Sequence, residues 1–343
     1  MRFSLTSEQL LLRDALRELL REQCPPNAVR TVFEAEGPAT IPGLWAKLVE
    51  LGVIGALAPE AVGGVGLDLI DLMVLIEESG RAAVPEPLID TAAVAVPLLA
   101  ALSEDPRAAR ALARVLAGDA RVAVALRAGA RVVPAELLIL ERASEIHLVD
   151  SAQARLTSAR SVDRTRHLQR VDFEASAETS VARGLRAQQL LAAAWDRAAL
   201  STAAQLIGLG ARMLALTTAH VQTREQFGRP IGSFQAVKHQ LVNAHVAVEF
   251  AQPLVYRAAH SIAREDPGAT LHVSMAKAMA SEAALLAART ALQLHGAIGY
   301  SYEYDLQLFM KRTWALAAAY GDALSHRTRI AEATLAAPGE EHA

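Results

Sequence analysis

The sequence has little cysteine, few aromatic residues and no excess of charge of either sign. Cys24 is the one cysteine among 343 residues, which excludes an internal disulfide and a cysteine-rich metal site. Aromatic residues make up 4% of the chain, whereas the strands of β-sandwiches favour aromatic and β-branched side chains. The 34 Lys and Arg residues against 37 Asp and Glu give a net charge of −3. This balance lacks the basic excess that nucleic-acid binding requires.

The sequence also lacks an apolar run long enough for a membrane span. The longest stretch without a charged side chain covers residues 198–211, whereas a spanning helix needs about 20 residues. The first residues lead into a charged amphipathic segment that does not resemble a secretory signal. Apolar residues still form 52% of the chain, enough for a large core. We therefore expect a cytoplasmic globular protein with neither a membrane nor a nucleic acid as partner.

Hydrophobic periodicity divides the chain into three domains and a tail. Residues 1–119 predict an N-terminal helical domain, in which Thr6 and Gln9 fit a capping box. Residues 120–180 contain short apolar runs separated by Gly, Pro and charges, and predict a small, truncated strand domain. Residues 181–336 predict a C-terminal four-helix bundle, and residues 337–343 a flexible tail. The expected fold class is mainly α with a small β domain.

The predicted elements can be given as ranges. Apolar runs typical of strands cover 122–126, 132–133, 137–140 and 146–149. Helical spacing in the C-terminal part covers 185–223, 234–262, 269–294 and 305–335. Glycine-bearing connections interrupt these long helices at 224–235 and at 293–299.

Those two connections carry a resemblance to the acyl-CoA dehydrogenases. Residues 224–236 read Arg-Glu-Gln-Phe-Gly-Arg-Pro-Ile-Gly-Ser-Phe-Gln-Ala, which is similar to the family's RxxFGxPIGxFQ turn. Residues 293–300 read Gln-Leu-His-Gly-Ala-Ile-Gly-Tyr, similar to its QxxGGxGY segment with Ala297 in place of one glycine. Residues 59–66 and 77–81 resemble its PExxGGxG and EExGR segments. The resemblance covers nearly the whole chain, with the segments in the family's order.

The resemblance implies contacts with a flavin held by another subunit. In the family, the residues of these two segments reach across a subunit boundary to the FAD of a neighbour. A cation and backbone donors suit a pyrophosphate, amides can donate to phosphate or adenine, and aromatic rings offer flat apolar surface. The alternative is a helix–turn–helix corner in which the same residues serve only geometry. The implied cofactor-binding residues are Arg224, Phe227, Gln235, Gln293, His295 and Gly296.

The residues that complete a flavin site of the chain's own are missing. The family's reaction needs a carboxylate to remove an α-proton from the acyl-CoA while a hydride goes to the flavin. Counting from Gly296, one of the family's two Glu positions falls on Tyr320, and a phenol is a poor base at neutral pH. The other position falls near Ala198, with Asp196 pointing elsewhere on the helix. Residues 120–180 contain neither a TEPxxGSD-like nor a W-I-(T/S) segment.

This pattern resembles the short subunit of heteromeric α2β2 acyl-CoA dehydrogenases of the actinobacterial steroid-degradation type. The resemblance implies a larger partner subunit that supplies the catalytic Glu and most of the acyl-CoA pocket, FAD shared between the two chains, and no catalytic residue here. The histidines lack ligand spacing, so no metal site is expected. Two alternatives stay open: a self-sufficient homomeric enzyme with Asp322 as an unusual base, or a helical scaffold without cofactor.

Overall fold

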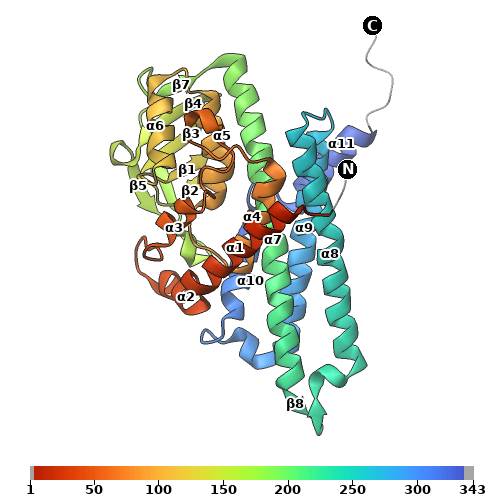
Figure 1. The fold of residues 1–343 in the computed structure, drawn as a ribbon. Helices are drawn as coiled ribbons and strands as arrows, with labels where there is room; N and C mark the ends of the chain where they lie inside the picture. Colours follow the sequence, from red (N-terminus) through yellow and green to blue (C-terminus); the bar gives the residue numbers. More distant parts are fainter. Residues whose placement is uncertain (1–3, 336–343) are drawn as a thin grey trace.

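The computed structural model describes residues 4–335, which form a helical N-terminal part, a strand-rich part and a long helical bundle (Figure 1). The capping box is confirmed at the first helix: the Thr6 hydroxyl accepts from the Gln9 N–H at 3.2 Å, and the Gln9 side chain accepts from the Thr6 N–H at 2.9 Å. A π-helical segment, η2 (Ile89–Ala95), leads directly into α5. The N-terminal helices are α1 (Ser7–Gln23), α2 (Pro26–Glu34), α3 (Leu44–Glu50), α4 (Leu69–Arg81), α5 (Val96–Ala101) and α6 (Pro106–Leu116).

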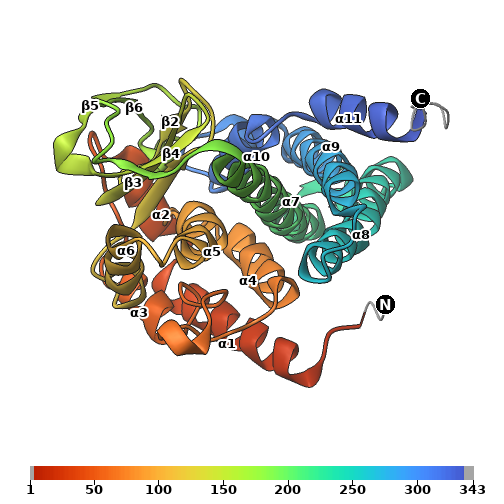
Figure 2. The same ribbon diagram turned by 90° about the horizontal axis from the view of Figure 1, so that it is seen from above.

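The middle of the chain forms two small sheets beside α5 and α6 (Figure 2). One has the strand order β1-β3-β4-β7, with β1 parallel to β3, and the other has the order β2-β6-β5. All four runs expected from the sequence are strands. The expectation missed β5, β6 and β7, because β5 and β6 face solvent at alternate or successive positions and carry few apolar residues. The strands are β1 (Val122–Ala125), β2 (Arg131–Val132), β3 (Leu137–Arg142), β4 (Glu145–Asp150), β5 (Arg155–Ser158), β6 (Gln169–Asp172) and β7 (Ser180–Ala182).

The C-terminal part is built on three long helices that pack on one another. They are α7 (Gly184–Thr223), α8 (Gln235–Ala263) and α9 (Ala269–His295). Helix α7 is long and apolar enough to cross a membrane by length and composition, but 78% of its most apolar window is buried inside the protein. Its apolar surface is therefore covered by α4, α8, α9 and neighbouring elements (Figure 2).

The expected single helix over 305–335 is wrong. The structure has two helices there, α10 (Leu306–Ala318) and α11 (Ala323–Leu335). Tyr320 and Gly321 between them have φ angles of +53° and +95°, which a helix cannot include. The ammonium group of the buried Lys277 donates to the carbonyls of Ala317 and Gly321, at 3.1 and 2.9 Å. The bond to Ala317 satisfies a carbonyl that the end of α10 leaves free, and the bond to Gly321 holds the turn that follows.

Glycine permits the close contact between the N-terminal part and the bundle. A Cβ on Gly208 of α7 would lie 1.9 Å from the carbonyl oxygen of Glu77, and a Cβ on Gly80 of α4 would lie 2.2 Å from that of Gln205. Any larger residue would force the two helices apart. This contact joins the N-terminal helices and the bundle into one core.

Candidate functional site

The two motif segments lie together at one end of the bundle, although about 70 positions separate them in the sequence. Helices α7 and α9 both end there, and β8 (Glu225–Gln226) marks this end in Figure 1. The rings of His220, in the last turn of α7, and His295, the last residue of α9, stack with centroids 4.4 Å apart and planes 21° apart. Arg224 and Gly296 directly follow these two helices. The structure therefore brings the two segments to one place.

The turn of the first segment is a tight hairpin that presents Phe227 to solvent. Strand β8 pairs with β9 (Arg229–Pro230), and Phe227 and Gly228 between them have φ angles of +53° and +77°. Two consecutive positive φ angles are typical of the two-residue turns that match the twist of a hairpin. The Phe227 side chain is 90% exposed and meets Phe234 edge-on, with centroids 6.1 Å apart. The Phe227 ring is therefore accessible at the tip of this hairpin.

Five of the six expected cofactor residues are exposed at this end: Arg224, Phe227, Gln235, Gln293 and Gly296. Gly296 has a φ angle of +63°, and a Cβ at its position would meet no atom within 4 Å. The backbone here is open to close approach by a ligand. A guanidinium, two amides and an open glycine are suited to the phosphate and adenine parts of a dinucleotide. The chemistry of this set therefore suits a ligand that carries phosphate and adenine groups.

His295 differs from the other five because it is buried and both ring nitrogens are engaged. Its Nδ1 donates to the Ala291 carbonyl at 2.8 Å, so Nε2 accepts from the Tyr304 hydroxyl at 3.1 Å. Burial lowers the pKa of His295, and burial together with the nearby Arg224 guanidinium lowers that of His220. Both imidazoles are thus neutral at pH 7, and Arg224 carries the positive charge. His295 fixes the loop and offers no donor to a ligand.

A second candidate site is the cleft between the strands and the bundle, where the resemblance would place the chain's own flavin. Its cavity of about 460 Å³ is lined by Tyr320, Trp195 and the arginines Arg127, Arg131 and Arg166. The Arg127 guanidinium lies over the Trp195 ring, 3.6 Å from its centroid. No carboxylate lines this cavity within the part of the chain that the structure describes. Two buried carboxylates, Glu86 and Asp90, line an adjacent cavity that shares Arg166 and Tyr320 with this one. The lining of the larger cavity itself therefore supplies no carboxylate base.

Tyr320, at the first of the family's two base positions, is held away from any catalytic role. Its hydroxyl donates to Oδ1 of the buried Asp90 at 3.0 Å, and its ring meets Trp195 edge-on at 5.7 Å. Burial raises the pKa of Tyr320 well above its ordinary value, and burial also raises the pKa of Asp90. Ala198, at the second base position, is fully buried. Neither position offers a base at neutral pH.

Asp322, the alternative base, is an exposed residue at the start of α11. Its Oδ1 accepts from the N–H and the hydroxyl of Ser325, at 2.8 and 2.7 Å. These hydrogen bonds hold the pKa of Asp322 below its ordinary value. A base exposed to water, with a lowered pKa and a capping role, is poorly suited to remove a weakly acidic proton.

The structure also bears on the metal and thiol chemistry that the sequence excluded. Residues 4–335 contain no group of three or more His, Cys, Asp or Glu placed to hold a metal ion. Cys24 is buried, and burial raises its pKa to about 12, so the thiol is not activated.

Comparison with known proteins places the chain in a family. Residues 6–119 match the family model described as "Acyl-CoA dehydrogenase, N-terminal domain", and residues 182–335 match "Acyl-CoA dehydrogenase, C-terminal domain". Acyl-CoA dehydrogenase IpdE2 of Mycobacterium tuberculosis is 34% identical, over 89% of this chain and 90% of the relative. The protein of the same name from Mycolicibacterium smegmatis is 33% identical, over 92% and 96%. The chain belongs to the acyl-CoA dehydrogenase family. Its homologues indicate an oxidoreductase that acts on acyl-CoA, and the family implies FAD as the cofactor.

Solved structures share the fold over almost the whole chain. A chain of the ChsE4-ChsE5 complex from Mycobacterium tuberculosis has a TM-score of 0.86 at 22% identity, and covers 99% of this chain and 100% of itself. A chain of the Tcur3481-Tcur3483 steroid ACAD has a TM-score of 0.80 at 25% identity, with 95% and 97% covered. Butyryl-CoA dehydrogenase from Megasphaera elsdenii has a TM-score of 0.84 at 19% identity, with 98% and 100% covered. The expected fold class is confirmed.

Asp90, Arg127 and Trp195, which lie in or beside the chain's own cleft, were not identified from the sequence. Of these residues, Asp90 was the easiest to predict from the sequence, because it is the one charged residue between Leu88 and Ser103. A lone carboxylate in an apolar run is buried with a partner in most structures. The Arg127–Trp195 stack joins residues that lie on different elements, and no local pattern indicates it.

Proposed function

We propose that this chain is the short subunit of a heteromeric acyl-CoA dehydrogenase, in which a larger partner subunit carries the catalytic Glu and most of the acyl-CoA pocket. The reaction is the α,β-dehydrogenation of an acyl-CoA thioester. FAD supplies the hydride acceptor when bound. In this proposal, Arg224 and Phe227, at one end of the helical bundle of the present chain, contact the FAD that the partner binds.

The observation that carries the proposal is the composition of the chain's own cleft. Three arginines, Trp195 and Tyr320 line it, and the nearest buried acid, Asp90, is engaged by the Tyr320 hydroxyl at 3.0 Å. Proton abstraction next to a thioester needs a carboxylate in reach of the α-carbon. This cleft has none among its lining residues, which supports assigning the base to a different chain.

The exposed end of the bundle gives independent support. Arg224, Gln293 and Gly296 face solvent beside the 90% exposed Phe227, and none of them lines the cleft. These side chains lie outside the cleft of their own chain. Their exposed position therefore suits contacts with a cofactor that is bound to another subunit. Arg224 would hold a phosphate oxygen, and Gln235 and Gln293 would donate to phosphate or adenine.

Two of the similar proteins support a heteromeric assembly and a steroid-derived substrate. The ChsE4-ChsE5 complex is a structure of two different chains, and the Tcur3481-Tcur3483 protein is described as a steroid ACAD. We propose a coenzyme A thioester of a steroid breakdown intermediate as the substrate of the assembled enzyme, with its acyl group held mainly by the partner.

Replacement of Arg224 tests the proposal in the purified complex of both chains. Arg224→Ala is expected to lower the FAD content of the complex at least tenfold at limiting FAD, because a charge-assisted contact with phosphate is lost. Arg186→Ala is the matched control: Arg224 directly follows α7, whereas Arg186 lies near the other end of this helix, where it pairs with Glu104 at 3.0 Å. Equal FAD content in the two variants would favour the cofactor-free scaffold.

A further inference from the structure

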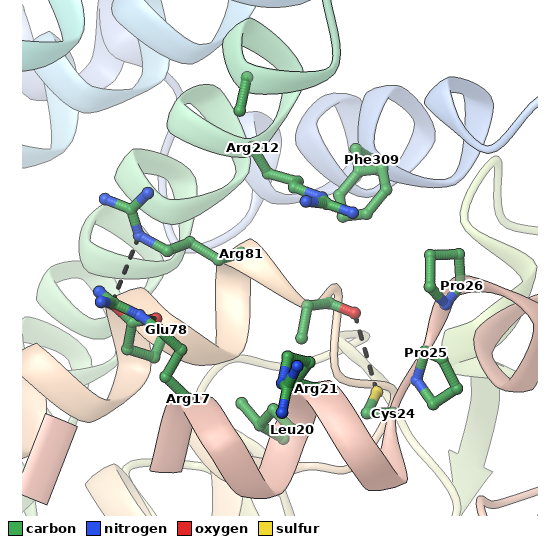
Figure 3. Close-up of a pocket in the computed structure, with 12 residues that line it drawn as sticks. Arg17, Leu20, Arg21, Cys24, Pro25, Pro26, Glu78, Arg81, Arg212 and Phe309 are labelled. Atoms are coloured by element: carbon green, nitrogen blue, oxygen red, sulfur yellow. Dashed lines mark hydrogen bonds and ion pairs between the residues drawn. The ribbon is translucent and has the colours of Figure 1, made fainter. Parts of the chain in front are cut away.

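A cavity of about 340 Å³ lies between α1, α4, α7 and α10 (Figure 3). Its floor is the C-terminal half of α1, and Arg212 and Phe309 lie above it. This volume is within the range of small-molecule pockets, about 300 to 1,000 Å³. None of its lining residues belongs to the two motif segments or to the cleft beside Tyr320.

The charged residues of this cavity are four arginines and one glutamate. The buried Glu78 carboxylate accepts from the Arg17 guanidinium at 2.7 and 3.0 Å, and lies 3.4 Å from Nε of Arg81. Arg81 also pairs with Glu77 at 3.0 Å. Arg21 pairs with Glu18 on the exposed side of α1. These acidic partners compensate three of the four guanidinium groups.

Arg212 is the arginine without a carboxylate. It forms no ion pair with any residue of the range 4–335. Its guanidinium carbon lies 5.7 Å from the centre of the Phe309 ring, and Figure 3 shows the group beside that ring at the top of the cavity. The ring holds the cation in place without neutralising it. The cavity therefore contains one uncompensated positive charge, on a half-buried side chain.

The remaining walls of the cavity are apolar. Leu20 comes from α1, Cys24 directly follows that helix, and Phe309 comes from α10 on the opposite wall. Cys24 donates weakly to the Ala82 carbonyl at 3.7 Å, so the thiol is occupied and adds no donor of its own. The other apolar lining residues are Pro25, Pro26, Ala82 and Ala215. Such walls favour a hydrocarbon body over a polar one.

We propose that this cavity binds an apolar monocarboxylate, with its carboxylate on Arg212 and its hydrocarbon part between Leu20 and Phe309. One uncompensated guanidinium matches one negative charge, and its planar fork matches a carboxylate. A phosphate dianion would leave part of its charge unpaired, and a neutral lipid would leave Arg212 without a partner. The site does not depend on the subunit role proposed above, since it uses no residue of the FAD-contact end.

Calorimetric titration of the full chain with octanoate, octanol and inorganic phosphate tests this inference. We expect octanoate to bind at least tenfold more tightly than octanol, because octanol has the same hydrocarbon chain without the charge. Phosphate alone is expected to bind at least tenfold more weakly than octanoate, because it gains nothing from the apolar walls. Equal binding of octanoate and octanol, or phosphate binding as tight as that of octanoate, would overturn the proposal.

Substitutions at two positions of the lining, Arg212 and Ala215, locate the binding in this cavity. Arg212→Leu keeps an apolar contact with Phe309 and is expected to weaken octanoate binding by roughly tenfold or more, and Arg212→Lys by less. Ala215→Leu places a larger side chain in the lining and is expected to weaken octanoate and octanol alike. Arg186→Leu, on the same helix but outside the cavity, is the matched control for a removed arginine. If Arg212→Leu and Arg186→Leu bind octanoate equally, with folds verified by circular dichroism, the assignment is wrong.

Discussion

The Tyr320 hydroxyl donates a 3.0 Å hydrogen bond to the carboxylate of Asp90, 230 positions earlier in the chain. This bond joins the turn after α10 to η2 in the N-terminal part, across the end of α7 that carries Trp195. Tyr320 stands at a position where the family resemblance predicts a base. Its hydroxyl is instead hydrogen-bonded to a buried carboxylate.

Loss of this hydrogen bond is expected to destabilise the protein. Tyr320→Phe removes the donor and leaves an oxygen of the buried Asp90 without it, at a cost of about 1–3 kcal/mol in the free energy of unfolding. Urea denaturation measures the change. Tyr302→Phe is the control, since Tyr302 is 65% exposed. If Tyr320→Phe is as stable as Tyr302→Phe, the bond does not stabilise the fold.

Asp322 is expected to affect stability and not catalysis. Asp322→Ala removes the side chain that accepts from the Ser325 N–H at 2.8 Å at the start of α11, and loss of such a cap costs about 0.5–2 kcal/mol. The specific activity of the complex with the partner subunit should change less than twofold. A loss of activity of a hundredfold or more in a folded variant would support the homomeric alternative with Asp322 as base.

Lys277 gives the stability a dependence on alkaline pH. Burial lowers the pKa of its amine from 10.5 to about 7. Between these two values the unfolded chain binds a proton that the folded chain does not, so the free energy of unfolding increases as pH rises through this window. The slope is at most about 1.4 kcal/mol per pH unit.

The variant Lys277→Met lacks the titrating group and serves as reference. We expect the stability of the wild type relative to Lys277→Met to increase by about 2 kcal/mol between pH 7.5 and 9.5, measured by urea denaturation at each pH. The neutral amine can still donate to Ala317 and Gly321 and can accept from the Ser281 hydroxyl, 3.0 Å away. Parallel stability curves for the two proteins would show that Lys277 stays charged in the folded state.

Phe227 is expected to serve the cofactor and not the fold. Its side chain is 90% exposed, so Phe227→Ala should change the free energy of unfolding of the chain by less than about 0.5 kcal/mol. The same variant should lower the affinity of the assembled complex for FAD, measured by titration of the apo-complex. Unchanged affinity would remove Phe227 from the cofactor contacts.

The position of Tyr320 in the cleft was predictable from the sequence, and the contacts of Tyr320 with Asp90 and Trp195 were not. Counting from Gly296 places Tyr320 and not Glu at the base position, and the structure agrees that Tyr320 lines the cleft. The proximity of Arg224 and Gly296 follows from three long helices that alternate in direction. The break at Tyr320 was missed, because apolar spacing continues across it and the stabilising contacts come from Lys277 on α9. Contacts between distant side chains leave no local signal.

The absorbance spectrum and mass of the chain, purified alone and together with its partner subunit, test the central claim most directly. We expect a colourless protein from the chain alone, and a yellow heterotetramer with one FAD for each pair of chains, because the proposal has each FAD held by residues of both subunits. A yellow homo-oligomer of this chain that oxidises an acyl-CoA, or a heterotetramer with one FAD per chain, would contradict the account.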